Sequence, residues 1–278
     1  MQYIGYLHPS LSELDYYSSS VKAAIVGLST ASFFAVYLLS AVLAQWSWTY
    51  RNLRAKEKIF WNLTVMRGAF GIFGTLAGIW ITWFDDELYK DVVFGTNATS
   101  HFILLVSVGF FVIECLVLTY SDVKYNSFNY MLHLHHWLAL SGYLSCIVLN
   151  SAHYFACVAL MLEITTPFSC ICWTLLKCGF ARTKLWKLNQ LVLVHLFHCR
   201  TLIEAFIFIQ SWRNWSTIWS SMPWSNFLIL HVGLVISFLY LTPYWTYKKT
   251  TQLVNPVDWN FEDSDRTRVM NGHVCKGE

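Results

Sequence analysis

Residues 101–120, HFILLVSVGFFVIECLVLTY, form an apolar run whose only carboxylate is Glu114. A helix needs about 20 such residues to cross the hydrocarbon core of a bilayer, so this run predicts a transmembrane helix. Six more runs have the same character, at residues 22–46, 64–84, 130–149, 153–176, 188–211 and 225–247. The sequence therefore predicts an all-α, polytopic membrane bundle of about seven helices.

The composition excludes several classes of protein. Of 278 residues, 56% are hydrophobic and 13% are charged, which is about half the charged share of soluble domains. Disordered chains are polar and poor in aromatic residues, whereas 18% of this chain is aromatic. A net charge of +3, split among short clusters, argues against nucleic acid as a partner. Most of the eight cysteines lie in apolar runs, so they predict buried thiols rather than disulfides.

The loop charges predict the orientation of the bundle. Basic residues gather after the first, fifth and seventh runs, at Arg51–Lys58, Lys177–Lys187 and Lys248–Lys249. Because cytoplasmic loops carry an excess of Lys and Arg, we expect these three segments in the cytosol. The predicted organisation is a lumenal N-terminus over 1–21, a transmembrane bundle over 22–247 and a cytosolic tail over 262–278.

Ionisable side chains inside the runs are costly in a membrane and mark candidate sites. They are Arg67, Glu114, Glu163, Arg200, Glu204, His133, His135, His136, His195 and His198. At about 1.5 Å per residue, His135 and His136 lie roughly 8–9 Å from the cytosolic edge, and Glu114 lies at a similar depth. The sequence therefore predicts that this set fills the cytosolic half of the bundle.

Helical phase divides these groups. At 100° per residue, His133 and His136 share a face of their helix, and His135 points nearly the opposite way. At most two of the three can line one cavity. Arg200 and Glu204 are spaced i, i+4, which favours a structural ion pair between them.

Each candidate also has a structural interpretation. The His135–His136 pair would then bond neighbouring helices. Glu163, followed by Thr165, Thr166 and Pro167, would sit at a kink whose polar groups satisfy freed carbonyls. Arg67 would reach the headgroups along its own side chain.

A metal site is a further alternative for the histidines. A di-iron centre needs several histidine ligands, and the chain offers His195, His198 and the histidines of residues 133–136. The divergent phase of the latter disfavours convergence on one metal, so we predict no metal ligands and no bound cofactor.

Several motifs resemble a known family. These are His135-His136, Leu162-Glu-x-Thr-Thr-Pro-Phe168, His195-Leu-Phe-His-Cys-Arg200, Pro243-Tyr-Trp-Thr246 and Asn255-Pro-Val-Asp-Trp-Asn-Phe261. Together they are similar to the TLC domain (TRAM–Lag–CLN homology), over about residues 54–261. The last string is most similar to the ceroid-lipofuscinosis branch of that family.

The resemblance implies a protein of the endoplasmic-reticulum membrane, extending to the ER–Golgi intermediate compartment. It also implies lipid handling, with His135 and His136 at a reacting centre that transfers acyl groups from acyl-CoA. The chain departs from ceramide synthases, because Trp137 follows the pair where those enzymes carry acidic residues. It also ends in Lys276-Gly277-Glu278 without the dilysine signal of the related branch, so location is inferred from the resemblance alone.

The leading hypothesis is acyl-CoA-dependent acylation of a lysophospholipid of the lysophosphatidylglycerol type. His135, His136 and Glu163 are the predicted catalytic residues. The two histidines are chosen because imidazole near pH 7 serves as nucleophile or base. The predicted substrate-binding residues are Arg67, Glu114, His195, His198 and Arg200. Lys56 or Lys58 is a second candidate for holding the CoA phosphates.

Two rival functions stay open. The branch resemblance also implies a cargo receptor that carries newly made lysosomal enzymes from the reticulum to the Golgi. Such a receptor would bind cargo through short lumenal segments, and coat proteins through the tail. A lipid sensor would bind acyl chains without turnover. Membrane lipids and acyl-CoA are the expected small partners, and a second copy of the chain is a further candidate partner.

Overall fold

The computed structural model describes residues 9–261, and all the regular elements in this range are helices. The predicted tail over 262–278 and its acidic Asp263-Ser-Asp265 lie outside the described residues, as do residues 1–8. Within 9–261, seven helices are long and apolar enough to cross a membrane. They span Ser19–Trp46, Ala55–Phe84, Ala98–Tyr125, Tyr130–Leu149, His153–Lys177, Lys184–Arg213 and Trp224–Val254. The all-α, seven-helix, multi-pass prediction is confirmed.

The elements follow one another with short connections. The first three spans are built from α2 (Ser19–Leu43) with η1 (Ala44–Trp46), α4 (Ala55–Phe84) and α6 (Ala98–Tyr125). The next two are α7 (Tyr130–Leu149) and the composite of α8 (His153–Ala159), η2 (Leu160–Thr165) and α9 (Thr166–Lys177). The last two are α10 (Lys184–Arg213) and the composite of α12 (Trp224–Ile236), η3 (Ser237–Leu241) and α13 (Thr242–Val254). Short helices α1 (Pro9–Ser12), α3 (Trp48–Asn52), α5 (Asp86–Lys90) and α11 (Trp215–Ser221) lie in the connections.

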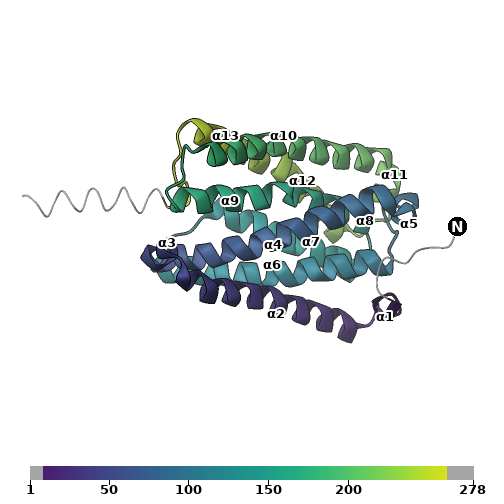
Figure 1. Ribbon diagram of the computed structural model, residues 1–278. Coiled ribbons are helices and arrows are strands. Elements are labelled where there is room, and N and C mark those ends of the chain that lie inside the picture. Colours follow the sequence, from purple (N-terminus) through teal and green to yellow (C-terminus); the bar gives the residue numbers. More distant parts are fainter. Residues whose placement is uncertain (1–8, 262–278) are drawn as a thin grey trace, which may run out of the picture.

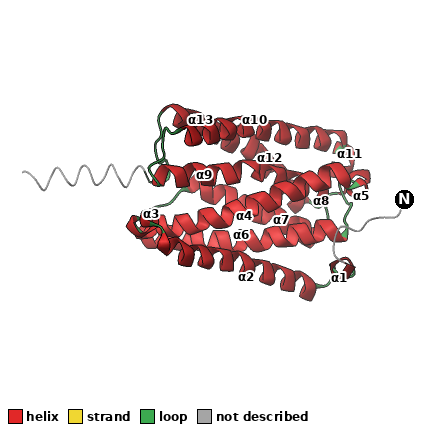
Figure 2. Cartoon of the chain, viewed as in Figure 1, coloured by secondary structure: helices red, strands yellow, loops and turns green. Residues whose placement is uncertain are grey.

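The helices run roughly side by side in an elongated bundle, and the described chain begins at one end and finishes at the other (Figures 1 and 2). Residues 47–54, 126–129, 178–183 and 255–261 connect or follow helices at the same end, which we call the basic end. Residues 85–97, 150–152 and 214–223 connect helices at the opposite end. All three predicted basic clusters therefore fall at one end of the molecule.

The core lies between α4, α6 and the composite α8–η2–α9 span. Phe70 of α4 stacks on Phe110 of α6 with ring centroids 3.8 Å apart, and both rings are almost fully buried. Helix α2 packs on α4 and α6 at the edge and presents most of its surface outward. These contacts fix the faces of α4 and α6 that point into the bundle.

Three glycines let the fifth span approach α4 closely. An added Cβ at Gly71 would lie 2.9 Å from Pro167, and one at Gly78 would lie 2.7 Å from Met161. At Gly74 the nearest atom would be the Glu163 side chain, at 3.4 Å. Small residues at such spacing allow close helix packing in membranes. Here they seat the 3₁₀ turn η2, and Glu163 with it, against α4.

The junction between the fourth and fifth spans is tight. Asn150 and Ala152 adopt left-handed backbone angles, φ 47° and 61°, so the chain reverses within residues 150–152. Asn tolerates this conformation because its short polar side chain bonds locally. The kink at Glu163–Pro167, one of the two interpretations of that motif, is also present, since η2 precedes α9 with Pro167 in its first turn.

Candidate functional site

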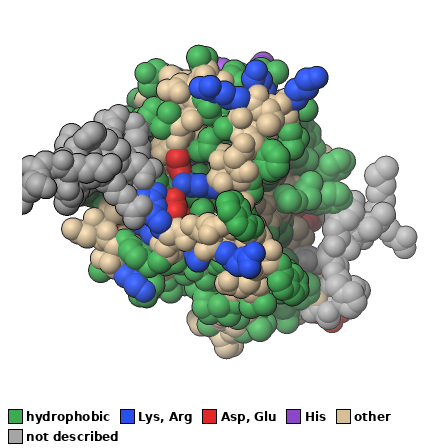
Figure 3. Space-filling view, turned by 60° about the vertical axis from the view of Figure 1, so that its left-hand side comes forward, with side chains coloured by type: hydrophobic (Ala, Val, Ile, Leu, Met, Phe, Trp, Pro, Cys, Tyr) green, Lys and Arg blue, Asp and Glu red, His purple; other side chains and the backbone are tan. Residues whose placement is uncertain are grey.

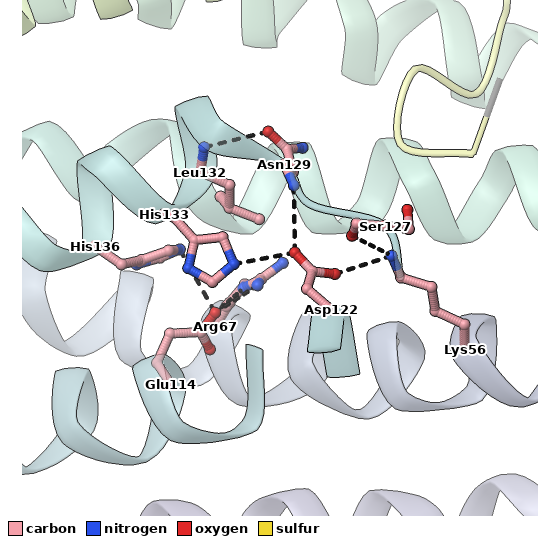
Figure 4. Close-up of polar contacts among 9 residues, drawn as sticks. All are labelled: Lys56, Arg67, Glu114, Asp122, Ser127, Asn129, Leu132, His133 and His136. Atoms are coloured by element: carbon pink, nitrogen blue, oxygen red, sulfur yellow. Dashed lines mark hydrogen bonds and ion pairs between the residues drawn. The ribbon is translucent and has the colours of Figure 1, made fainter. Parts of the chain in front are cut away.

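The site begins with an ion pair between two helices near their basic ends. Arg67 Nε of α4 donates to Glu114 Oε1 of α6 at 2.8 Å, and Arg67 Nη2 contacts the same oxygen. His136 Nε2 of α7 lies 3.5 Å from that oxygen (Figure 4). Arg67 is 8% exposed and Glu114 is fully buried. Arg67 is therefore buried in the bundle, and the alternative interpretation, in which it reaches the headgroups, is wrong.

A second cluster closes the basic end beside this pair. Asp122 accepts hydrogen bonds from His133 Nε2 at 3.0 Å and from the backbone of Asn129, and it pairs with Lys56 Nζ at 2.9 Å (Figure 4). Asn129 also caps α7, because its side chain accepts from the Leu132 backbone. Lys56 is thus engaged by a carboxylate, which argues against its candidate role on CoA phosphates.

The predicted division of the histidines by helical phase is confirmed. His133 and His136 both turn toward α6, where they meet Asp122 and Glu114. His135 turns away and packs edge-on against Trp245 of α13, with ring centroids 5.1 Å apart. Neither ring nitrogen of His136 has a hydrogen-bonding partner among residues 9–261.

A polar cavity of about 1230 Å³ lies toward the basic end. Its walls carry Arg67, His135, His136, Glu163 and Arg200, and its outer part is lined by Lys248, Lys249, Trp259 and Asn260. Figure 3 shows Lys and Arg side chains gathered at this end of the molecule around a few carboxylates. Lys248 Nζ lies 3.7 Å from the centre of the Trp259 ring.

An apolar cavity of about 930 Å³ extends from the same place toward the opposite end. Leu138, Gly142, Leu230, Leu234 and Leu241 are among the residues that line it. His135, Glu163 and Arg200 line both cavities, so these three side chains stand at the junction between the polar and the apolar space.

Arg200 is held at this junction by several contacts. Its Nε donates to Thr242 Oγ1 at 3.0 Å, its Nη1 donates to the Leu162 carbonyl at 3.3 Å, and Glu204 lies 3.7 Å away. Glu204 Oε1 accepts from Thr242 at 2.8 Å and from Ser237 at 2.5 Å. The predicted Arg200–Glu204 pair is confirmed, and the π-helical turn η3 brings Ser237 to it. π-Turns inside helices are frequent at functional sites.

The structure corrects the expectation that His195 and His198 share this site. Both side chains are exposed on the outer surface of α10, and His195 Nδ1 donates to the Leu191 carbonyl one turn earlier. The inward face of α10 instead carries Leu193, Phe197 and Arg200, and Glu204 follows one turn after Arg200. No group of three or more His, Cys, Asp or Glu side chains within 9–261 is arranged to hold a metal.

Several residues that line the polar cavity are not among those predicted from the sequence. Trp245, Trp259 and Asn260 belong to motifs that were quoted only for their resemblance to a family, and Lys248 was used only to orient the bundle. Lysines and aromatic residues are common where a helix leaves a membrane, so these residues carried no signal for a cavity in the sequence. The placement of Trp259 and Asn260 depends on residues 255–261 folding back over the bundle, as the Lys177–Asp258 ion pair at 2.6 Å requires.

A family model described as the TLC domain matches residues 29–250 of this chain. The chain belongs to the TLC-domain family. It is 36% identical over 266 residues to Protein CLN8 of Homo sapiens, covering 95% of this chain and 93% of that protein. The rat Protein CLN8 is 35% identical over 271 residues, covering 95% and 94%. TLC domain-containing protein 1 of Gallus gallus is 25% identical over 190 residues, covering 67% and 73%.

These comparisons confirm the resemblance to the TLC domain and to its ceroid-lipofuscinosis branch. The matched range, 29–250, begins within α2 and ends within α13, so it includes most of the residues that line the two cavities. No solved structure gives a significant match. The chain is thus a multi-pass membrane protein with a TLC domain, and its site is defined by its own geometry.

Proposed function

We propose that this protein is a lipid-handling protein of the endoplasmic-reticulum membrane that transfers an acyl group from acyl-CoA to a lysophospholipid. The observation that carries the proposal is the position of His135, Glu163 and Arg200 between a polar and an apolar cavity. A thioester has the same two parts, a polar CoA moiety and an apolar chain, on either side of the reacting carbonyl. The junction matches that division.

The polar cavity would take the CoA moiety. Lys248 and Lys249 line its outer part, and their positive charge suits phosphate groups. The apolar cavity would take the acyl chain, because its aliphatic walls favour hydrocarbon and exclude water. The reacting carbonyl would then lie beside His135 and Arg200.

His135 is the proposed nucleophile because it reaches both cavities. Its ring nitrogen would attack the thioester carbonyl, the carbon–sulfur bond would break, and the CoA thiolate would leave. The acceptor hydroxyl would then attack the acyl-imidazole, with its proton passing to Glu163 and the carbon–nitrogen bond breaking. Arg200 would stabilise the oxyanion of each tetrahedral intermediate through its buried guanidinium.

His136 has a supporting role in this proposal. Its ring is 6% exposed, and Nε2 lies close to the carboxylate that Arg67 neutralises. An imidazole beside that ion pair is fixed in orientation, and it packs against His135 with ring centroids 5.2 Å apart. We therefore expect His136 to position His135, and Glu114 to position His136.

The test is acyl transfer from acyl-CoA to lysophosphatidylglycerol by purified full-length protein in lipid nanodiscs. We expect His135→Ala to abolish transfer and His136→Ala to reduce it, whereas His195→Ala, on the outer surface of α10, serves as the matched control. Undiminished transfer in both site variants would refute the mechanism.

The same variants separate the rival functions. A cargo receptor for lysosomal enzymes would keep its crosslinks to those enzymes in His135→Ala and lose them when the opposite-end residues 212–224 are replaced. A lipid sensor would bind acyl-CoA in the wild type without any release of free CoA thiol. Either pattern would replace the acyltransferase proposal.

A further inference from the structure

A third hollow opens on the outside of the bundle, between α4 and α9. This side groove, of about 650 Å³, is lined by Val65, Gly68, Ile72, Ile171 and Leu175, among others. Val65, Ile72 and Ile171 are 44%, 55% and 45% exposed, on helices that are long and apolar enough to cross the membrane. The groove is therefore open to the hydrocarbon of the bilayer.

Gly68 makes the groove possible. A Cβ added there would find its nearest neighbour, the Cys170 Cβ, at 4.0 Å, whereas Gly71 and Gly78 have no such room. The hollow thus arises where α4 and α9 diverge beyond the close contact at Gly71 and Pro167. It is a space that a chain of methylene groups can occupy without moving the helices.

The groove adjoins the polar cavity. Thr64 and Cys170 line both spaces, so two small side chains form the partition between the bilayer and the chamber that holds Arg67, His136 and Glu163. Arg67 and Arg200 are paired with Glu114 and Glu204, so the excess of positive charge in the polar cavity behind this partition comes from Lys248 and Lys249. Such a chamber favours a head group with a negative charge.

We propose that the side groove is the entry and chain-binding site for the acceptor, a single-chain anionic phospholipid drawn from the bilayer. Its chain lies along Gly68 between α4 and α9, and its head group passes between Thr64 and Cys170 into the polar cavity. The inference rests on the proposed function for the identity of this lipid, but the groove itself is defined by the structure. The donor acyl chain and the acceptor chain then occupy separate spaces on either side of the junction residues.

The acceptor needs an apolar space of its own, apart from the cavity that holds the donor chain. A lysophospholipid carries its own chain, which cannot share the apolar cavity with the donor chain while both react at His135. The bilayer side of α4 and α9 offers an apolar surface next to the site, so the acceptor stays in a membrane environment. Only its head group and free hydroxyl enter the chamber.

The experiment uses full-length protein in nanodiscs with a lysophosphatidylglycerol that carries a diazirine in its chain. After irradiation, labelled peptides are identified by mass spectrometry. We expect labels on residues of α4 and α9 that line the groove. Gly68→Phe should lower this labelling by at least about tenfold, which corresponds to about 1.4 kcal/mol of binding.

The control is Gly27→Phe on α2, a helix that does not line the groove, at a position where an added Cβ has no neighbour within 4 Å. It introduces the same ring into a membrane-spanning helix and should leave the labelling unchanged. Thermal midpoints of both variants are measured, and Gly68→Leu provides a smaller filling side chain. Labels outside the groove, or labelling that Gly68→Phe and Gly68→Leu leave unchanged, would overturn the proposal.

A competition experiment tests the charge of the head group. Unlabelled lysophosphatidylglycerol should displace the probe, and monoacylglycerol, which lacks the phosphate, should not. Equal displacement by both would overturn the anionic part of the proposal. Groove labelling in a protein that transfers no acyl group would support the groove and refute only the acyltransferase function.

Discussion

The buried pair of Arg67 and Glu114 gives the sharpest test of how the site is held. Arg67 donates twice to one carboxylate oxygen, and the Glu114 side chain has no exposed surface. The substitution Arg67→Met keeps a long apolar side chain and removes both donors. It leaves the Glu114 charge in the interior with only the His136 ring beside it.

The magnitude follows from this geometry. Removing one partner of a buried ion pair costs about 3–5 kcal/mol, because the remaining charge is uncompensated. One kcal/mol shifts the thermal midpoint of a domain of comparable size by about 2–4 °C. We therefore expect the midpoint of Arg67→Met to fall by roughly 6–20 °C, the product of these two ranges.

The double variant Arg67→Met, Glu114→Leu removes both charges and should unfold at a higher temperature than Arg67→Met alone. Replacing both members of a buried pair by apolar groups is often close to neutral. The two residues are in contact, so the effects of the single substitutions should not add.

The assay is thermal unfolding of detergent-solubilised protein, followed by tryptophan fluorescence. Arg51→Met, at an exposed position on α3, is the matched control and should leave the midpoint unchanged. A midpoint for Arg67→Met within about 2 °C of wild type, the shift expected for less than 1 kcal/mol, would refute the reasoning. A double variant no more stable than Arg67→Met would refute it as well.

Two further substitutions probe the packing around the site. Gly78→Leu should lower the free energy of unfolding by about 1–3 kcal/mol or more, because the new Cβ would lie 2.7 Å from Met161. The thermal midpoint of this variant should therefore fall, and an unchanged midpoint would contradict the close approach of the two helices. Lys177→Met removes the ammonium that pairs with Glu57 and Asp258 at 2.6 Å each. The backbone amides of residues 255–261 should then exchange hydrogen faster, and unaltered protection of these amides would contradict the anchoring of that segment.

The sequence predicted those features that depend on local composition. The seven spans follow from the length of the apolar runs. The division between His133, His136 and His135 follows from 100° per residue, and it needs no knowledge of partners. The same holds for the Arg200–Glu204 pair, since both residues lie on one helix.

What the sequence left open is which neighbour each side chain meets. Glu163 reaches the cavity junction because η2 settles on the glycine face of α4, and neither element specifies the other by itself. The pairing of Arg67 with Glu114 joins residues 47 positions apart, beyond any local pattern. The glycines at 71, 74 and 78 carry a packing signal, but that signal does not name its partner.

The misplacement of His195 and His198 has a physical reason that applies to membrane helices in general. In a soluble protein the outer face is polar, so an apolar stripe marks the inside. Around α10 the solvent is lipid, and apolar side chains cover both faces. A histidine can then lie outside if its donor is satisfied, as His195 achieves through the carbonyl of Leu191 on its own helix. Arg200 has one partner on its own helix, Glu204 at 3.7 Å, but two of its donors are satisfied only by Thr242 and Leu162 of other elements, so the side chain is buried against them. The demand for partners, more than polarity itself, therefore separates the residues of the site from those of the surface.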